Sequence, residues 1–272
     1  MRRLPILERG EIAMPLESTP GTQTLFRGLA VLEAVAGGAH DLSALGRVLG
    51  LSRSTTQRLA SALVKAGYLR GEGEGYALGA KLIELGFQAR EQVPLARLAR
   101  PHLEALAQRT QDTVHLGLPE GVEVLYLDKI PGQRGLEMRS RIGHRMPMAL
   151  TGVGKALMLD LPEDRWRALY ESGLAHPASR GSPRPWEAYR DEMRRYAAQS
   201  VALDFAENEI GIHCVAAPVR DAGRGIVAAV SLASAAQHMP EERMLSLVPE
   251  VAATAEAISR SLGWRATAPR AA

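Results

Sequence analysis

The sequence of 272 residues predicts an α+β fold organised as two domains. Three observations support this prediction. Apolar residues recur at helical spacing in three short runs before residue 67. From residue 113 onward, strand-like alternation is mixed with helical patterns, without the strict order of βαβ units. A chain of this length, with 46% hydrophobic residues, can bury one small core and one larger core.

The overall composition excludes several classes of protein. The single cysteine, Cys214, excludes an internal disulfide framework and a cysteine-rich zinc module, and it fits a reducing compartment, so we expect a cytoplasmic protein. We expect neither a signal peptide nor a membrane span. The net charge of +3 is too small to identify a nucleic-acid binder by itself. Residues 1–20 hold three prolines and no sustained period, so we expect a flexible tail there and another at 265–272.

The first domain, residues 21–79, is expected to begin with three short helices. The first covers 22–36; Asp41 caps the second, and Ser52 caps the third, which ends at Gly67. Two short strands, at 68–70 and 76–78, then flank a glycine-rich turn and predict a hairpin. Three helices with a tight turn, followed by such a hairpin, form a winged helix-turn-helix.

Polar and basic side chains gather at the start of the third helix, where they can reach base edges and phosphates in a major groove. The candidate DNA-binding residues are Arg47, Arg53, Ser54, Thr55, Thr56, Gln57, Arg58 and Arg70. We expect Arg58 to contact phosphate and Thr55, Thr56 and Gln57 to reach base edges. The alternative is a solvated helix face with an ordinary cap. The absence of acidic residues between 47 and 70 and the hairpin that follows favour a DNA interface.

Helical spacing returns in residues 80–110, where Pro94 and Pro101 should bend or restart the helix. We expect a linker helix over 80–97 and a second domain over 98–264. In that domain the patterns predict strands at 113–118, 122–129, 211–220 and 225–233, and helices at 151–159, 164–171, 186–198 and 241–262.

The segment Thr151-Gly152-Val153-Gly154-Lys155-Ala156 invites a phosphate-loop reading because Gly-Lys opens a helix. The full motif fails, since Ala149 and Ala156 stand where it needs a glycine and a hydroxyl residue. The remaining interpretation is a helix start whose free amides can bind a small anionic group.

Asp204, Glu207, His213 and Cys214 could suggest a metal site, but their spacing matches no defined zinc motif, and adjacent strand residues point to opposite faces. We prefer an acidic loop followed by a strand whose inward Cys214 lines a pocket; a small buried cysteine is the alternative. No metal or cofactor is expected. An enzyme using Asp204, Lys155 and Cys214 is the weaker alternative, because nothing places a base beside the thiol. A multimeric scaffold is a third, and His115 and the other histidines are interpreted as structural or surface residues.

Taken together, these segments resemble the IclR family of bacterial transcription regulators over about residues 22–264. The resemblance rests on the motifs Leu51-Ser52-Arg53-Ser54-Thr55-Thr56-Gln57-Arg58-Leu59 and Thr151-Gly152-Val153-Gly154-Lys155-Ala156, and on segments 24–32, 67–69, 76–79, 142–148 and 211–219. It implies a winged helix-turn-helix, a linker helix and a GAF-like effector-binding domain, assembled as homodimers or dimers of dimers on a promoter inverted repeat.

The same resemblance implies the effector site and the function. The implied effector-binding residues are Met138, Met146, Gly152, Val153, Asp204, Cys214, Ser231 and Ala233. Ala233 stands where the family can supply a second hydroxyl group. We therefore expect a ligand-responsive regulator of a catabolic operon, not an enzyme, that binds double-stranded promoter DNA and senses a sugar-derived or aromatic acid. We favour a repressor over an activator.

Overall fold

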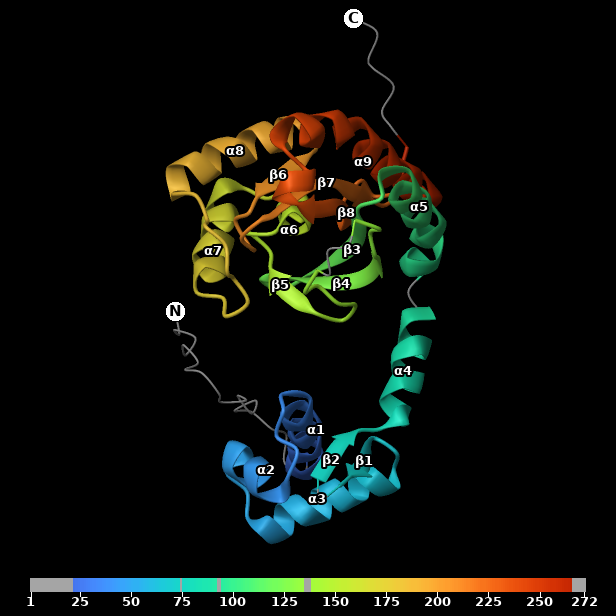
Figure 1. Cartoon of the computed structure of the whole chain (residues 1–272), viewed down its shortest axis with the longest axis vertical. Coiled ribbons are helices and arrows are strands. Elements are labelled where there is room, and N and C mark those ends of the chain that lie inside the picture. Colours follow the sequence, from blue (N-terminus) through green and yellow to red (C-terminus); the bar gives the residue numbers. More distant parts are fainter. Residues whose placement is uncertain (1–21, 74, 92–93, 135–137, 266–272) are drawn as a thin grey trace, which may run out of the picture. The chain divides into compact units, whose positions relative to one another are not determined.

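The computed structural model describes residues 22–73, 75–91, 94–134 and 138–265. The chain divides into two compact units, residues 1–92 and 93–272. Figure 1 shows a first unit of helices with a small hairpin and a second unit in which helices surround a sheet. The predicted α+β class, with a winged helix-turn-helix followed by a larger mixed domain, is confirmed.

The first unit contains the predicted helices and hairpin. They are α1 (Gln23–Ala36), α2 (Leu42–Leu49), α3 (Arg53–Lys65), β1 (Leu69–Glu72) and β2 (Gly75–Leu78), followed by α4 (Ala80–Glu91). At the start of α2, the amides of Ser43 and Ala44 donate to Oδ1 of Asp41, each at 2.8 Å, as a helix cap requires. Gly50 ends α2 with a φ of 61°, which glycine adopts without steric cost.

A small core holds the three helices to the hairpin. Val31 from α1, Leu45 from α2, Leu59 from α3 and Leu69 from β1 are all buried in it. The hairpin is also tied to the loop before α2, because the Tyr76 amide donates to the carbonyl of His40 at 2.7 Å. This packing fixes which faces of α3 remain open to solvent.

In the region expected as a linker helix over 80–97, the described residues form α4 up to Glu91 and α5 (Pro94–Thr110) from Pro94 onward. The predicted restart near Pro94 falls next to residues 92–93, which lie outside the described residues. At Pro101, where a bend or a restart was predicted, the helix does not restart, since Pro101 lies inside α5. Ala99, Leu103 and Leu106 are fully buried on this helix, and their packing holds it together across the backbone hydrogen bond that proline cannot make.

In the described part of the second unit, six strands form one antiparallel sheet in the order β5-β4-β3-β8-β7-β6. The strands are β3 (Thr113–Glu120), β4 (Glu123–Ile130), β5 (Arg145–Pro147), β6 (Ala202–Phe205), β7 (Ile212–Arg220) and β8 (Ile226–Ala235). The short edge strands β5 and β6 were not predicted. Asp204, expected in an acidic loop, therefore lies on a strand.

Helices cover both faces of this sheet (Figure 1). α5 and α9 (Glu241–Ser261) pack on one face, and α6 (Gly152–Leu157) packs on the other, beside α7 (Glu163–Leu174) and α8 (Trp186–Gln199). A short 3-10 helix, Ala236–His238, precedes α9. None of the helices in the described ranges combines the length and apolarity that a membrane span needs.

Candidate functional site

The start of α3 presents a polar and basic surface. Four exposed side chains form this surface, in two pairs that are each one helical turn apart: Arg53 with Gln57, and Ser54 with Arg58. The Ser52 hydroxyl accepts a hydrogen bond from the Thr55 amide at 3.3 Å and caps the helix, as predicted. These four side chains are accessible to a polyanion, although Ser54 Oγ also lies 3.2 Å from Ser52 Oγ.

Thr56 departs from the expectation that it lies on this exposed face. Its side chain is fully buried, and its hydroxyl donates to the carbonyl of Ser52 at 3.0 Å. It faces α2 closely enough that a Cβ added to Gly46 would lie 3.7 Å from its Oγ1. Thr55 is half-buried, and its Oγ1 accepts a hydrogen bond from the Ser52 hydroxyl at 3.0 Å. Base contacts by Thr56 are therefore excluded.

Further basic residues of the first unit extend the exposed patch. Arg47 lies in the last turn of α2 and is exposed, as is Lys65 at the end of α3. Arg70, the second residue of β1, is exposed but makes an ion pair with Glu72 at 3.4 Å. Part of the Arg70 charge is thus neutralised within the hairpin, although exposed ion pairs of this kind are weak.

The second unit contains a hollow with a cavity volume of about 40 Å³ between the sheet and α6. All eight residues that the resemblance implied line it, namely Met138, Met146, Gly152, Val153, Asp204, Cys214, Ser231 and Ala233. Seven residues that were not predicted line it as well: His115, Tyr126, Ser140, Thr151, Asn208, Glu209 and Ile212. We call this space the main hollow.

The strand register explains why these distant residues meet. Asp204 on β6 pairs with Cys214 on β7, which pairs with Ala233 on β8, which pairs with Thr113 on β3. Directly paired residues of an antiparallel sheet project from the same face. His115 and Ser231 form the neighbouring pair on that face. Asp204, Cys214 and Ala233 from this row, together with His115 and Ser231, thus form the floor of the main hollow.

α6 closes the hollow because glycine lets it approach the floor. A Cβ added to Gly152 would lie 2.8 Å from the Cβ of Cys214, and one added to Gly154 would lie 2.0 Å from the carbonyl of Met148. The two glycines therefore serve close packing. The expectation that the amides of this helix start are free is wrong for Gly154, which donates to Thr151 Oγ1 at 3.1 Å. The Gly152 amide lies close enough to the Asp204 carboxyl to lower its pKa.

Asp204 is the main acidic group on the floor. It is buried, and its Oδ1 accepts a hydrogen bond from the Glu207 amide at 2.8 Å. Loss of hydration raises the pKa of the Asp204 carboxyl to about 7, although the nearby Lys155 charge and the two amides oppose the rise. A carboxyl with this pKa exchanges a proton near neutral pH and can donate or accept a hydrogen bond.

Lys155 does not face the hollow. It is fully buried, and its Nζ donates to the carbonyl of Leu203 at 3.1 Å and forms an ion pair with Glu207. The ammonium also lies 5.5 Å from the ring centroid of Tyr189. The lysine is therefore neutralised inside the core and is unavailable to a ligand.

His115 is the principal site residue that the sequence interpretation missed. Its Nε2 lies 2.8 Å from Ser140 Oγ, and its Nδ1 lies 3.5 Å from Ser231 Oγ. Loss of hydration, assisted by the Lys129 charge, lowers the pKa of His115 to about 3, so the ring is neutral at pH 7. Asn208 was missed as well, and its buried Oδ1 has no hydrogen-bond partner among the described residues. A polar residue inside an otherwise apolar strand was the available signal for His115.

Cys214 faces the hollow, whereas His213 turns away and its Nδ1 lies 2.9 Å from the Met239 carbonyl. Loss of hydration raises the pKa of the Cys214 thiol well above its usual range, so it is a neutral polar group. Within the described residues, no three His, Cys, Asp or Glu side chains are grouped to hold a metal ion. The hollow thus offers hydroxyl, thiol, imidazole and carboxyl groups beside an apolar wall of methionines.

Two family models match the chain. The IclR helix-turn-helix domain matches residues 24–73, and the bacterial transcriptional regulator IclR C-terminal domain matches residues 87–260. The HTH-type transcriptional regulator XynR of Escherichia coli K12 is 32% identical over 254 residues, which cover 91% of this chain and 100% of XynR. The DNA-binding transcriptional repressor YiaJ of the same bacterium is 30% identical over 94% of both chains.

Solved structures show the same architecture. A transcriptional regulator from Rhodococcus sp. RHA1 aligns with a TM-score of 0.78 at 27% identity, covering 89% of this chain and 98% of that protein. A homologue from Microbacterium hydrocarbonoxydans, solved with 4-hydroxybenzoate, aligns with a TM-score of 0.73 at 26% identity, covering 89% and 99% of the two chains. These similarities extend over both units.

Proposed function

Because the chain belongs to the IclR family of bacterial transcriptional regulators, we propose that it is an effector-controlled repressor of a catabolic operon. It acts in the bacterial cytoplasm, where promoter DNA lies. The observation that carries the proposal is the main hollow, which gathers eight implied effector residues from separate elements. The exposed basic start of α3 supplies the matching DNA surface. YiaJ, a relative of similar length, bears the name of a repressor, which supports that direction of control.

The effector in this proposal is a small hydroxylated organic acid, sugar-derived or aromatic. Hydroxyl groups of the effector can form hydrogen bonds with Asp204, His115 and Ser231, because each of these side chains can act as a donor or an acceptor. Met138, Met146 and Val153 suit a short carbon chain or a ring. The 4-hydroxybenzoate bound by the Microbacterium homologue belongs to this chemical class.

Promoter recognition in this proposal needs two copies of the chain. One helix-turn-helix reads few base pairs, so an inverted repeat with half-sites about one helical turn apart requires a symmetric dimer. α4 supports this assembly, because Ile83 and Phe87 are 65% and 61% exposed on it, one turn apart. Large apolar side chains left in solvent on one helix are typical of a protein interface.

Fluorescence anisotropy with the flanking intergenic DNA tests the proposal. We expect salt-dependent binding that is much tighter than to scrambled DNA of equal length and composition. Asp204→Ala and Ser231→Ala should weaken effector binding in calorimetry while leaving effector-free DNA affinity unchanged. Equal affinity for both DNAs at every salt concentration would overturn the assignment as an operator-specific regulator.

A further inference from the structure

The main hollow offers no unpaired cation to an organic acid. The carboxyl groups of Asp204 and Glu209 line it, and its described lining residues include neither lysine nor arginine. Lys155 behind the floor is paired with Glu207, and Arg139 is paired with Glu209 at 3.8 Å. A carboxylate placed in the main hollow would lose its hydration without gaining a free cation. An acidic effector therefore needs a positive group elsewhere.

A second, smaller hollow, with a cavity volume of about 10 Å³, lies on the same face of the sheet. Met138 and Ala233 line both hollows, so the two spaces share a wall. Thr113, directly opposite Ala233 in the strand register, lines the second hollow, whereas Cys214, the other neighbour of Ala233, lines the first. The row from Asp204 to Thr113 crosses three strand spacings, roughly 14 Å between Cα positions. The two hollows are therefore adjacent along this row, and a ligand longer than the main hollow would enter the second one.

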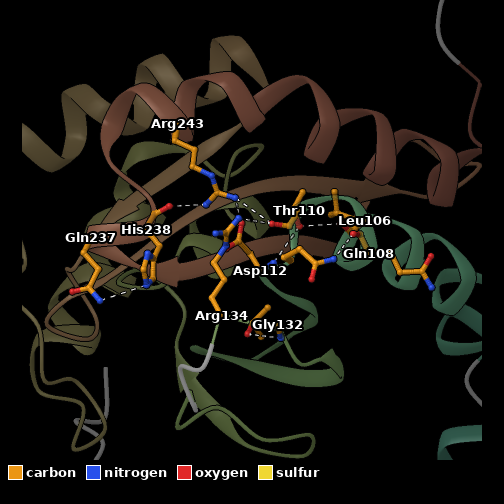
Figure 2. Close-up of polar contacts among 11 residues, drawn as sticks. Leu106, Gln108, Thr110, Asp112, Gly132, Arg134, Gln237, His238 and Arg243 are labelled. Atoms are coloured by element: carbon orange, nitrogen blue, oxygen red, sulfur yellow. Dashed lines mark hydrogen bonds and ion pairs between the residues drawn. The ribbon is translucent and has the colours of Figure 1, made fainter.

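The second hollow has a positive group at its end. Asp112 is buried there between two arginines, Arg134 from the loop after β4 and Arg243 from α9. Figure 2 shows both guanidinium groups converging on its carboxylate. Arg134 donates through Nε to Asp112 at 2.9 Å and through Nη2 to the Thr110 carbonyl at 3.1 Å. Two positive charges around one negative charge leave an excess of one positive charge.

Arg134 is the arginine that can reach a ligand. It lines the second hollow, and its Nη1 makes no hydrogen bond or ion pair with any described residue. Arg243, in contrast, does not line either hollow, and its Nη1 donates to the His238 carbonyl at 2.8 Å. The Asp112 carboxylate holds the Arg134 guanidinium in place without occupying all of its donors.

We infer that the second hollow is the carboxylate subsite of the effector site, with Arg134 as the group that selects acids over neutral compounds. This inference rests on the proposed effector function. The effector lies along the floor with its hydroxyl groups toward Asp204 and its carboxylate toward Arg134. A charge-assisted hydrogen bond from a pre-positioned guanidinium is strong enough to set such a preference.

Paired probes test the inference on the full-length protein by isothermal titration calorimetry. 4-Hydroxybenzoate is compared with 4-hydroxybenzamide, and D-gluconate with D-glucitol, so that each acid has a neutral counterpart. For any acid that the wild type binds, we expect an affinity at least about ten-fold higher than for its neutral counterpart. Arg134→Gln should abolish that preference and leave the affinity for the neutral compound within about two-fold of the wild-type value. Arg134→Lys should retain part of it, because the charge remains without the fork of donors.

Arg243→Gln is the matched control, since it removes one arginine from the same carboxylate without changing the lining of the hollow. It should leave most of the acid preference, and thermal unfolding should show whether both variants fold equally well. An acid preference that survives in Arg134→Gln, or that Arg243→Gln removes as completely, would overturn the inference. If Asp204→Asn and Ser231→Ala weaken neither member of a pair, the main hollow is not the effector site and the proposed function fails instead. Absence of binding by all four probes at 10 mM counts against both.

Discussion

α3 and α6 begin in the same way and have opposite environments. Each follows a hydroxyl residue that caps it: Ser52 accepts from the Thr55 amide at 3.3 Å, and Thr151 accepts from the Gly154 amide at 3.1 Å. Each carries cationic side chains in its first turns. At α3 they are exposed, whereas Lys155 of α6 is fully buried against Glu207. The positive charge of a capped helix start is thus available to a ligand only where no internal carboxylate has already neutralised it.

Lys155→Met should produce the largest effect on this comparison. It leaves the buried Glu207 carboxylate without its cation, and we expect the free energy of unfolding to fall by about 3–5 kcal/mol. Arg58→Met, the matched change in α3, should stay within about 0.5 kcal/mol, because Arg58 is exposed. Urea unfolding followed by circular dichroism measures both. Equal stabilities for the two variants would remove the energetic basis of the comparison.

Gln57→Ala should change which DNA sequence α3 prefers. Gln57 is exposed near the helix start, and a lost side-chain contact to a base edge costs about 1–3 kcal/mol of discrimination at one base pair. Thr56→Ala is the control: it should lower stability but keep the sequence preference, because Thr56 is buried. Anisotropy with a set of single-base operator variants measures the preference. A uniform loss on specific and random DNA would assign Gln57 to the backbone instead.

Arg58→Ala should weaken binding to all DNA sequences alike. A phosphate contact that releases one counterion contributes about ten-fold to affinity near 0.1 M salt, and its removal lowers the logarithmic salt slope by about 1. Arg167→Ala, which removes an exposed arginine from α7, should leave both quantities unchanged. Binding titrations at several salt concentrations provide the slopes. An unchanged slope in Arg58→Ala means that Arg58 contacts no phosphate.

Asp204, which lies on β6 beside the start of α6, predicts a pH dependence of stability, which we expect to be the smallest effect. The Asp204 carboxyl has a pKa of about 7 in the folded chain, above the ordinary value of 3.8, so the unfolded chain loses this proton at lower pH. The contribution of Asp204 to stability therefore declines between about pH 4 and pH 7 and stays low above. The Asp204→Asn variant lacks this decline. Its free energy of unfolding should therefore rise by on the order of 1 kcal/mol relative to that of the wild type between pH 5 and pH 8. Parallel stability profiles in urea would contradict the raised pKa.

The first unit could be predicted almost completely because its signals are local. Asp41, Gly50 and Ser52 mark helix ends through interactions within a few residues, and the structure contains those caps. Thr56 was the exception. Its neighbours Ser54, Gln57 and Arg58 are exposed, and the packing of α2 against α3 decides that Thr56 is buried. That packing leaves no mark in the composition of α3.

The second unit could be predicted only in outline because its site depends on the register of strands far apart in the chain. The eight implied effector residues came from a family resemblance, and their convergence became visible through the pairs Asp204 with Cys214 and Cys214 with Ala233. β6 has four residues, too few for a periodic signal, so Asp204 was read as part of a loop. His115 was missed because its partners Ser140 and Ser231 lie far from it in the sequence.

The contact between Gly152 and Cys214 limits how this regulator can evolve toward new effectors. Because even one methyl group at Gly152 would collide with Cys214 and approach Asp204, the floor tolerates few changes that keep the helix in place. Met138, Met146 and Ile212 form its wall from a loop, an edge strand and a strand end, where neighbouring structure yields more easily. Substitutions that change the effector preference should therefore occur mainly in this wall, while the floor residues stay nearly constant.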